Sequence, residues 1–284
     1  MNVTEAYARC EAVTRTEAKN FSYGIRLLPP AKRQAMSALY AVARRIDDIG
    51  DGVDPGPVKL DALAEIRTQL AAIVADPMAA GDDPILVALA DASARYPIPM
   101  TALEELIDGC EMDVNGTTYR TFDDLVVYCR RVAGTVGRLS LGVYGCDDPV
   151  AAEPLADALG VALQITNILR DVVEDRDTMG RVYLPRADLA RFGAGDDLRG
   201  PVDNVAAVIA FEAARAETWY AEGLRLLPLL DRRSRACTAA MAGIYRRLLV
   251  RIQRQPAAVL HTRVSLPAWE KAQVALLGLT RGRS

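Results

Sequence analysis

Two segments of the sequence place acidic side chains at the spacing of one helical face. When residues 38–52 are drawn as a helix, one narrow face carries Tyr40, Arg44, Asp47, Asp48 and Asp51, with apolar residues opposite. Three like charges in the last turn of a helix repel one another and oppose its dipole. The face therefore predicts a bound cation. A solvent-exposed helix end, on which Arg44 pairs with Asp47 or Asp48, explains the same spacing and stays open at this point.

A second segment, residues 159–175, supplies a matching face. Its back is Ala, Ile, Leu and Val, and its front carries Gln164, Asn167, Asp171 and Asp175. Carboxylate and amide oxygens without histidine or cysteine suit a hard cation such as Mg²⁺, or Mn²⁺ in its place. The only histidine, His261, lies in neither segment, which argues against a histidine metal site or a Ser-His-Asp triad. Two such faces turned toward each other would bind a diphosphate through several Mg²⁺ ions.

Helical periodicity dominates the whole chain. Apolar repeats separated by Gly, Pro or Asp clusters predict helices over 4–19, 31–49, 57–76, 84–95, 100–112, 121–144, 150–176, 203–227, 231–254 and 266–278. Strand patterns are scarce, and no flexible linker or internal repeat divides the chain. The sequence therefore predicts an all-α, single-domain bundle over 1–284. Within it, the small residues at 133–137 indicate a close helix approach or a helix break, and the flanking Arg130, Arg131 and Arg138 are expected in solvent.

Composition narrows the class of partner. The 284 residues carry a formal charge of -3 with a pI near 5.4, which excludes a general attraction to nucleic acid. Five cysteines without a CxxC pair indicate reduced thiols, and the polar N-terminal segment is unlike a secretory signal. No run approaches the roughly 18 apolar residues of a membrane span. We therefore expect a cytoplasmic protein, either soluble or peripheral to the inner face of the membrane.

Several segments resemble the squalene/phytoene synthase family. The resemblance runs through residues 20–52, 128–137, 159–185 and 241–249, and so extends over nearly the whole chain. It implies the isoprenoid synthase fold, an all-α bundle with a central active-site cavity. The chain departs from the family pattern in one place, where Ala18-Lys19-Asn20 stands at the position of a frequent Ser-Lys-Ser. The departure puts hydroxyl contacts to phosphate at positions 18 and 20 in doubt.

The resemblance also implies roles for individual residues. The metal ligands would be Asp47, Asp48, Asp51, Asn167, Asp171 and Asp175. The catalytic residues around the diphosphate would be Tyr40, Arg44, Tyr128 and Arg170. The substrate would be bound by Phe21, Tyr23, Gln164, Tyr245 and Arg263.

Members of the resembled family join two allylic prenyl diphosphates head to head. One diphosphate leaves with help from Mg²⁺ and arginines, the allylic cation attacks the double bond of the second substrate, and loss of a proton closes a cyclopropane. Stretches such as NFSYGIRLLP and RRIDDIGDG most resemble the actinobacterial branch associated with hopanoid-type squalene formation. This favours two C15 farnesyl diphosphates and the product presqualene diphosphate, with or without a later step to squalene. Phytoene synthesis from two C20 geranylgeranyl diphosphates is the alternative.

Cofactor and partner expectations follow from this reaction. The first half-reaction is expected to need no NADPH, and the lack of a Gly-x-Gly-x-x-Gly motif decides little about a later reduction. Prenyl diphosphates are the expected substrates, with transient membrane contact and downstream isoprenoid enzymes as further partners. Two other classes stay open. One is a terpene cyclase or chain-elongating prenyltransferase with the same fold and acidic motifs, and the other is a non-catalytic helical bundle that binds a metal or a partner.

Overall fold

The computed structural model describes residues 1–18 and 20–281, and every regular element within those ranges is a helix. The α-helices are α1 (Val3–Glu17), α2 (Phe21–Ile25), α3 (Pro30–Asp51), α4 (Gly56–Ala75), α5 (Pro84–Arg95), α6 (Thr101–Val114), α7 (Phe122–Cys129), α8 (Thr135–Tyr144), α9 (Pro149–Asp177), α10 (Arg186–Phe192), α11 (Val202–Gly223), α12 (Arg232–Arg254) and α13 (Ala268–Arg281). Turns of 3₁₀ helix are η1 (Pro77–Ala80), η3 (Leu224–Leu229) and η4 (Pro256–Leu260), and η2 (Arg130–Gly134) is a π-helical turn. The all-α prediction is confirmed.

Most helices begin and end within three residues of their predicted bounds, because Asp, Pro and Gly mark their ends. Asp83 and Asp148, for example, cap α5 and α9 by accepting hydrogen bonds from backbone N–H groups of the first turn. The single helix predicted over 121–144 is found as one continuous helical segment over 122–144, which contains the π-helical turn η2 between α7 and α8. The helices α2 and α10 were missed, because five and seven residues show too few turns for a periodic pattern.

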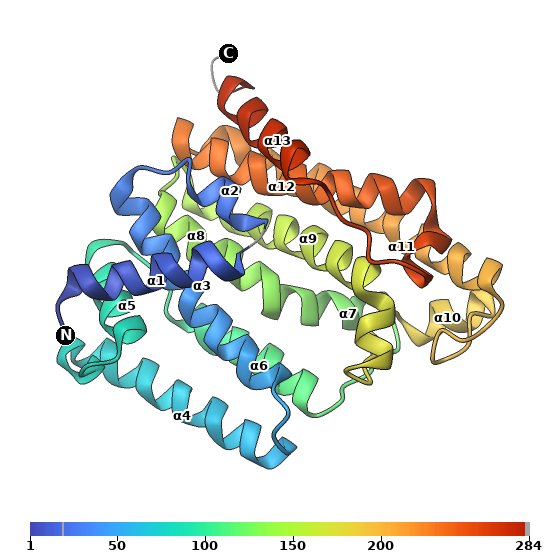
Figure 1. The fold of residues 1–284 in the computed structure, drawn as a ribbon, viewed down its shortest axis with the longest axis horizontal. Coiled ribbons are helices and arrows are strands. Elements are labelled where there is room, and N and C mark those ends of the chain that lie inside the picture. The colour runs from blue at the N-terminus through green and yellow to red at the C-terminus, as the bar shows by residue number, and fades with distance from the viewer. Residues whose placement is uncertain (19, 282–284) are drawn as a thin grey trace.

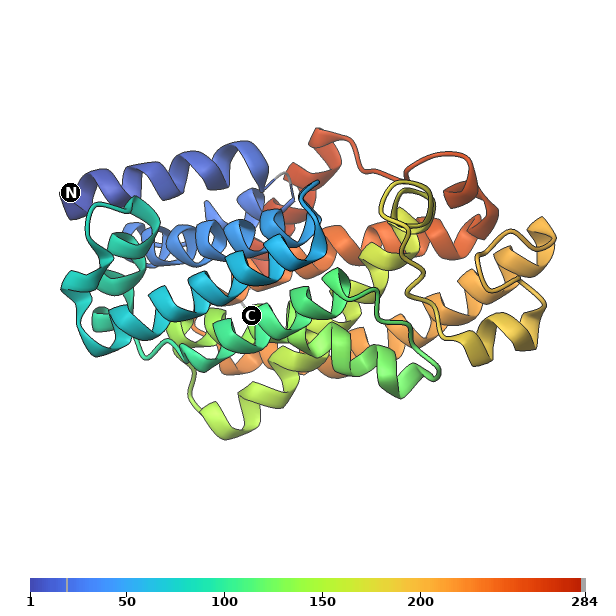
Figure 2. The same cartoon turned by 90° about the horizontal axis from the view of Figure 1, so that it is seen from below.

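The helices lie in layers around α9. Figure 1 shows α9 crossing the middle of the molecule, with α11, α12 and α13 along one side and α3, α6 and α4 along the other. α9 packs against α8, α11 and α12, and α3 packs against α1, α5 and α6. Seen from below, α10 lies at the end opposite the N-terminus (Figure 2). The two helices with predicted acidic faces, α3 and α9, therefore belong to the inner part of the bundle.

Two large apolar cores fill the bundle. The first is built mainly from α3, α4, α5, α6 and α8, and Leu103 is fully buried in it. The second is built mainly from α7, α9, α11 and α12, and Leu169 is fully buried there. Phe21 and Val132 pack against both cores while remaining only partly buried. The boundary between the cores thus passes between α3 and α9 and is lined by apolar side chains that are not fully covered.

The π-helical turn η2 lies directly against α9. A Cβ added at Gly160 of α9 would stand 2.5 Å from the carbonyl oxygen of Ala133 and 2.6 Å from the backbone nitrogen of Gly134. Atoms do not approach so closely, so only glycine lets α9 reach this turn. The small run at 133–137 therefore marks a close helix approach, and it begins within a π-helical turn and not at a helix break.

Of the three flanking arginines, Arg138 is buried in a charge network and Arg130 faces water. Asp157 of α9 is 5% exposed and accepts hydrogen bonds from the Nε atoms of Arg130 and Arg138, at 3.1 Å each. Arg138 also pairs with Glu105 at 2.6 Å and is 13% exposed. The solvent expectation was wrong for Arg138, because a buried carboxylate requires a charged partner. Arg130 is 56% exposed, and Arg131 is partly buried.

We predict that Gly160→Ala destabilises the protein by about 1–3 kcal/mol, because the methyl group must push α9 away from η2. The melting temperature measured by circular dichroism should fall by several degrees. Gly56→Ala is the matched control, since its Cβ would meet nothing nearer than 3.8 Å and should leave the melting temperature unchanged or slightly higher. Equal melting temperatures for the two variants would contradict the close approach.

Candidate functional site

Carboxylates from the final turns of three helices meet on the inner side of the bundle. Asp47 and Asp51 lie at the end of α3, Asp113 at the end of α6, and Asp171 and Asp175 near the end of α9. Each of these helix ends also presents the negative end of a helix dipole. The site is therefore strongly negative and favours cations.

The pKa values of these acids report their crowding. Burial raises the pKa of Asp47 to about 6, and the negative charges of Asp51, Asp48 and Asp113 add to the shift. Burial and Asp171 raise the pKa of Asp175 to about 7. Water reaches 54% of the Asp47 side chain, so the pKa is raised because surrounding protein displaces bulk solvent, not because the carboxylate is sealed off. Accessible, mutually repelling carboxylates are the arrangement that a bound cation stabilises.

Arginines neutralise the acids of α3. Arg44, one turn earlier on the same helix, pairs with Asp47 at 3.3 Å and with Asp48 at 2.5 Å. Asp51 pairs at 2.6 Å with Arg181, which follows α9 in the chain. These contacts include the local ion pair expected of a solvent-exposed helix end, but the partner of Asp51 comes from the opposite side of the site.

Two arginines occupy the same carboxylate on α9. Arg170 binds Asp171 through Nε at 2.8 Å and through a second nitrogen, and Arg263 binds it at 2.8 and 3.2 Å. Arg263 also lies 3.4 Å from Glu174. The carboxylate of Asp175 accepts no hydrogen bond from the described part of the chain. The structure thus brings Arg263, from the segment before α13, to the same place as Arg170.

A left-handed glycine sets the position of Arg181. Gly180 has φ +66°, and the turn it makes lets the backbone N–H of Arg181 donate to the carbonyl of Asp175 at 2.9 Å. The Arg181 side chain then reaches Asp51 and the carbonyl of Gly50, the latter at 3.1 Å. Arg181 was not among the predicted site residues. The signal that was available is an arginine directly after a glycine that ends an acidic helix.

Tyr128 reaches the site through Asp113. Its hydroxyl donates to one oxygen of Asp113 at 2.8 Å, and the hydroxyl of Tyr183 donates to the other at 2.9 Å. The rings of Tyr128 and Tyr183 stack with centroids 5.1 Å apart. Burial raises the pKa of Asp113 to about 6, although both hydrogen bonds favour its charged form. Sequence analysis missed Asp113 as a site residue because its predicted helix ended at residue 112.

Asn167 and Gln164 lie on the same helix as Asp171 and Asp175, and the amide oxygen of Asn167 is free. The Asn167 amide nitrogen lies 3.5 Å from the Gln164 oxygen, which is a weak contact. The Asn167 oxygen Oδ1 is buried and has no hydrogen-bond partner, a costly arrangement unless a ligand completes it. Together with Asp171 and Asp175 it provides the oxygen donors that Mg²⁺ prefers, so these residues fit the metal.

The described residues contain no preassembled group of three acidic, histidine or cysteine side chains around one metal position. The arginine contacts explain why. Guanidinium groups occupy the carboxylates of Asp47, Asp51 and Asp171, so these oxygens are paired with arginine and do not converge on one position. A metal bound there would replace arginines as the neighbours of these oxygens.

Two of the predicted aromatic residues, Phe21 and Tyr245, lie where α2 packs against α12. Phe21 and Tyr245 have ring centroids 5.5 Å apart, and Tyr245 lies beside Arg170. Burial raises the pKa of Tyr40 to about 12, with Arg44 nearby opposing the shift. Tyr23 packs against the second core and forms no ion pair or hydrogen bond with the carboxylates in the described chain. Lys19, in the departure from the family pattern, lies outside the described residues.

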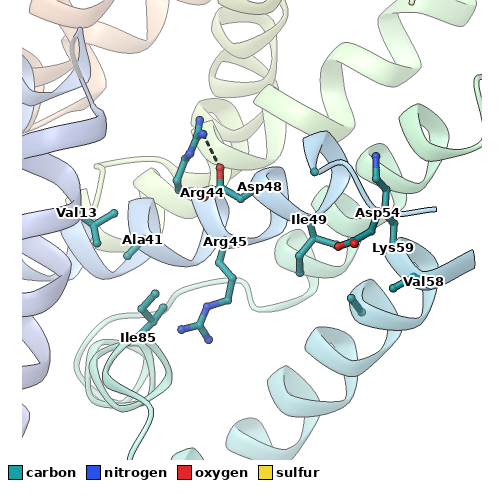
Figure 3. Close-up of a pocket in the computed structure, with 12 residues that line it drawn as sticks. Val13, Ala41, Arg44, Arg45, Asp48, Ile49, Asp54, Val58, Lys59 and Ile85 are labelled. Carbon is teal, nitrogen blue, oxygen red and sulfur yellow. Dashed lines mark ion pairs between the residues drawn. The ribbon is translucent and has the colours of Figure 1, made fainter. Parts of the chain in front are cut away.

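A cavity of about 430 Å³ lies on the outer side of α3, among α1, α4 and α5 (Figure 3). Arg44 and Asp48 line it, and so does Arg45, which is held by Asp83 through bonds of 2.8 and 3.0 Å. Asp47 and Asp51 are not part of its lining. Asp48 therefore differs from its neighbours, because it borders this outer cavity and orients Arg44.

The chain is similar in sequence and in structure to known members of one protein family. The sequence model of the squalene/phytoene synthase family matches residues 14–270. A phytoene synthase of Mycobacterium tuberculosis is 50% identical over 98% of this chain and 91% of its own. A dehydrosqualene synthase crystal structure superposes with a TM-score of 0.88 at 29% identity, covering 98% of this chain and 97% of the other. A squalene synthase from Alicyclobacillus acidocaldarius gives 0.80 at 34% identity, covering 89% and 95%. The resemblance noted in the sequence is confirmed.

We predict that Mg²⁺ and inorganic diphosphate together raise the melting temperature, whereas either alone has a small effect. Mg²⁺ alone must displace arginines from the acids and leave those arginines unpaired, and diphosphate alone meets an acidic surface. When both bind, Mg²⁺ neutralises the carboxylates and diphosphate pairs with the displaced arginines. At about 100 times the dissociation constant the stabilisation is about 2.7 kcal/mol, or roughly 5–10 °C. Differential scanning fluorimetry measures the shift.

Three variants sharpen this measurement. Asp51→Asn and Asp175→Asn should lose the shift, because each removes an oxygen ligand on one side of the site. Asp61→Asn, an exposed acid of α4, should keep it. A full shift in Asp51→Asn or Asp175→Asn would exclude that residue from the metal site.

Proposed function

The chain belongs to the squalene/phytoene synthase family, and we propose that it condenses two geranylgeranyl diphosphates head to head, as in phytoene synthesis. As a member of this family it is a prenyltransferase. The C20 substrate is supported by the name phytoene synthase, which relatives from two Mycobacterium species carry at 50% identity. The sequence favoured a C15 substrate and left the C20 substrate as the alternative. The proposal adopts that alternative.

The observation that carries the proposal is the meeting of two acidic helix ends with four arginines from separate parts of the chain. A diphosphate is itself an anion and cannot approach the carboxylates until cations neutralise them. Asp47, Asp51, Asn167, Asp171 and Asp175 would hold Mg²⁺, with Mn²⁺ as a substitute. The bound metal supplies a Lewis acid that stabilises negative charge on the leaving diphosphate.

The arginines act by exchanging partners. Once the carboxylates bind metal, the guanidinium groups that now hold them are free to donate to diphosphate oxygens. Arginine suits this exchange because its planar fork pairs equally well with carboxylate and with phosphate. Four guanidinium groups would line the diphosphate from three directions: Arg44, Arg170, Arg181 and Arg263.

The reaction then follows from holding two substrates with their first carbons close together. The C1–O bond of one substrate breaks and diphosphate carries the electron pair away. The resulting allylic cation forms a bond to the double bond of the second substrate, and loss of a proton closes the cyclopropane. Water must be kept from the cation, and the partly covered apolar side chains that pack against both cores, Phe21 and Val132, would supply part of that wall.

Condensation of two farnesyl diphosphates is the second candidate. It is favoured by the likeness to a dehydrosqualene synthase structure at a TM-score of 0.88. Neither reaction needs NADPH in its first half, and reductant use is part of what the product assay below decides. The proposal also includes contact with downstream isoprenoid enzymes. A cytoplasmic location is part of it too, and the five free cysteines support that location.

We predict that geranylgeranyl diphosphate is used with a kcat/KM at least about tenfold higher than farnesyl diphosphate, since tail length is recognised by apolar contacts. Each substrate is incubated separately with Mg²⁺, with and without NADPH, and the products are identified by mass spectrometry. A C40 hydrocarbon without NADPH is the expected product. Preference for farnesyl diphosphate would establish the second candidate. A product built from one substrate would indicate a terpene cyclase, and no diphosphate release from either would indicate a non-catalytic bundle.

We predict that Asp47→Asn, Asp51→Asn, Asp171→Asn and Asp175→Asn each lower kcat/KM more than about 100-fold. Asp48→Asn should lower it less, because Asp48 borders the outer cavity and acts through Arg44. Steady-state kinetics at limiting Mg²⁺ measures both effects, with Asp61→Asn as the control and circular dichroism to check folding. A variant of the first four that keeps nearly the wild-type rate is not a metal ligand.

A further inference from the structure

Asp113 differs from the other acids of the site in the groups that hold it. Asp51, for example, is paired with an arginine, whose guanidinium group can turn to a phosphate oxygen when a metal takes its place. Both oxygens of Asp113 instead accept hydroxyl groups, from Tyr128 at 2.8 Å and from Tyr183 at 2.9 Å. A phenol carries no positive charge for diphosphate to attract. Asp113 is therefore not part of the exchange of partners that the arginines make.

The two tyrosines tie the end of α6 to two other parts of the chain. Tyr128 lies near the end of α7 and is 3% exposed, and Tyr183 lies in the segment after α9 and is 8% exposed. Because both side chains are nearly buried, their hydroxyl groups depend on Asp113 as the acceptor. Each oxygen of Asp113 thus already has a partner that would be costly to lose.

Tyr183 stands two residues after Arg181 in the segment that follows α9. The backbone N–H of Arg181 holds the start of this segment, by donating to the end of α9 at 2.9 Å. Farther on, the backbone N–H of Arg186 donates to the carbonyl of Tyr119 at 2.9 Å. Between these two bonds, residues 182, 184 and 185 have apolar side chains. The hydroxyl of Tyr183 on Asp113 is therefore the side-chain hydrogen bond that anchors the stretch next to Arg181.

The charge of Asp113 also acts on Arg181 itself. Burial lowers the pKa of Arg181, but Asp113 and Asp51 oppose this effect, and the pKa lies above its usual value. The guanidinium group donates at 2.6 Å to Asp51, which is one of the proposed metal ligands. That bond would be lost when a metal occupies Asp51. Asp113 would then remain to hold the guanidinium charge within the site.

We propose that Asp113 is a positioning residue and not a metal ligand. Through the hydroxyl of Tyr183 it keeps the segment after α9 in place. It thereby keeps Arg181 directed at the diphosphate while Asp51 changes its partner from arginine to metal. The two hydroxyl partners of Asp113 are the same in the free and in the ligand-bound protein. The inference rests on the proposed function, because that function gives Arg181 a diphosphate to bind.

Tyr183→Phe tests the anchor, because it removes one hydroxyl group and nothing else. Isothermal titration calorimetry measures the affinity for inorganic diphosphate at saturating Mg²⁺. The dissociation constant should rise at least about fivefold, since Arg181 is held less firmly. In an Arg181→Ala background the same substitution should change it by less than about twofold, because two changes that act through one contact are not additive. A general loss of structure would weaken binding in both backgrounds and would overturn the proposal.

Asp113→Asn separates positioning from metal binding. The amide oxygen can accept one of the two hydroxyl groups, but the amide nitrogen cannot accept the other. Diphosphate binding should therefore weaken in this variant. The Mg²⁺ concentration at half-saturation, measured with saturating diphosphate, should stay as in the wild type. A raised Mg²⁺ requirement would make Asp113 a metal ligand and would overturn the proposal.

Tyr119→Phe is the matched control. Tyr119 is 1% exposed, and its ring centroid lies 5.4 Å from that of Tyr128 and 6.2 Å from that of Tyr183. Its hydroxyl is buried and has no hydrogen-bond partner in the described part of the chain. The control should bind diphosphate as the wild type does. Equal weakening in Tyr119→Phe, or unchanged binding in Tyr183→Phe, would contradict the role of Asp113.

Failure of this role can be told apart from failure of the proposed function. Turnover of prenyl diphosphates by the wild type, together with unchanged diphosphate binding in Tyr183→Phe, would overturn the positioning role alone. Weakened binding in Tyr183→Phe, without turnover of any prenyl diphosphate by the wild type, would support the positioning role and overturn the proposed function alone. A wild-type protein that binds no diphosphate would overturn both.

Discussion

Negative charge at the ends of α3, α6 and α9 is the constraint on which the rest of the site depends. Carboxylates and helix dipoles of one sign meet there, and folding brings them together only if cations come with them. The chain supplies arginines from α3, from α9, from the turn after α9 and from the segment before α13. The backbone must therefore bring these four segments to the site, because their arginines neutralise its carboxylates.

The same pairing of arginines with carboxylates explains how one set of side chains can serve both the free protein and the protein with metal and diphosphate bound. Arg170 and Asp171 are 12% and 14% exposed, so neither charge could be left alone without a large penalty. Asp47 and Arg44 are more exposed, and their pairing contributes less. Replacing guanidinium by a divalent ion at these oxygens keeps every carboxylate neutralised. Giving the released guanidinium a diphosphate oxygen keeps every arginine paired, so metal and diphosphate are expected to bind together.

The parts of the site that the sequence predicted are those set by helical periodicity. The acids of α3 and α9 share a face because of the 3.6-residue turn alone, and the predicted bounds of those helices are nearly right. Arg181 depends instead on a left-handed turn at Gly180, and Asp113 on a helix that continues two residues beyond its predicted end. The burial of Arg138 depends on Asp157, a partner that only tertiary packing brings near. Contacts between distant segments carry no periodic signal, so these features were missed.

Under the proposed function, the charged site binds only the head group, so the likeness of RRIDDIGDG to one branch of the family, which favoured a C15 substrate, carries no physical information on tail length. Every prenyl diphosphate presents the same head group to the carboxylates and arginines, whatever the length of its tail. Relatives named phytoene synthase and structures named for squalene or dehydrosqualene synthesis are therefore all similar to this chain. If the chain binds prenyl diphosphates as proposed, the tail would lie where the two apolar cores leave side chains partly uncovered, as at Phe21 and Val132. Selectivity would then depend on how far the boundary between the cores extends behind the charged site, and substitutions there should alter product length while the acids hold the head unchanged.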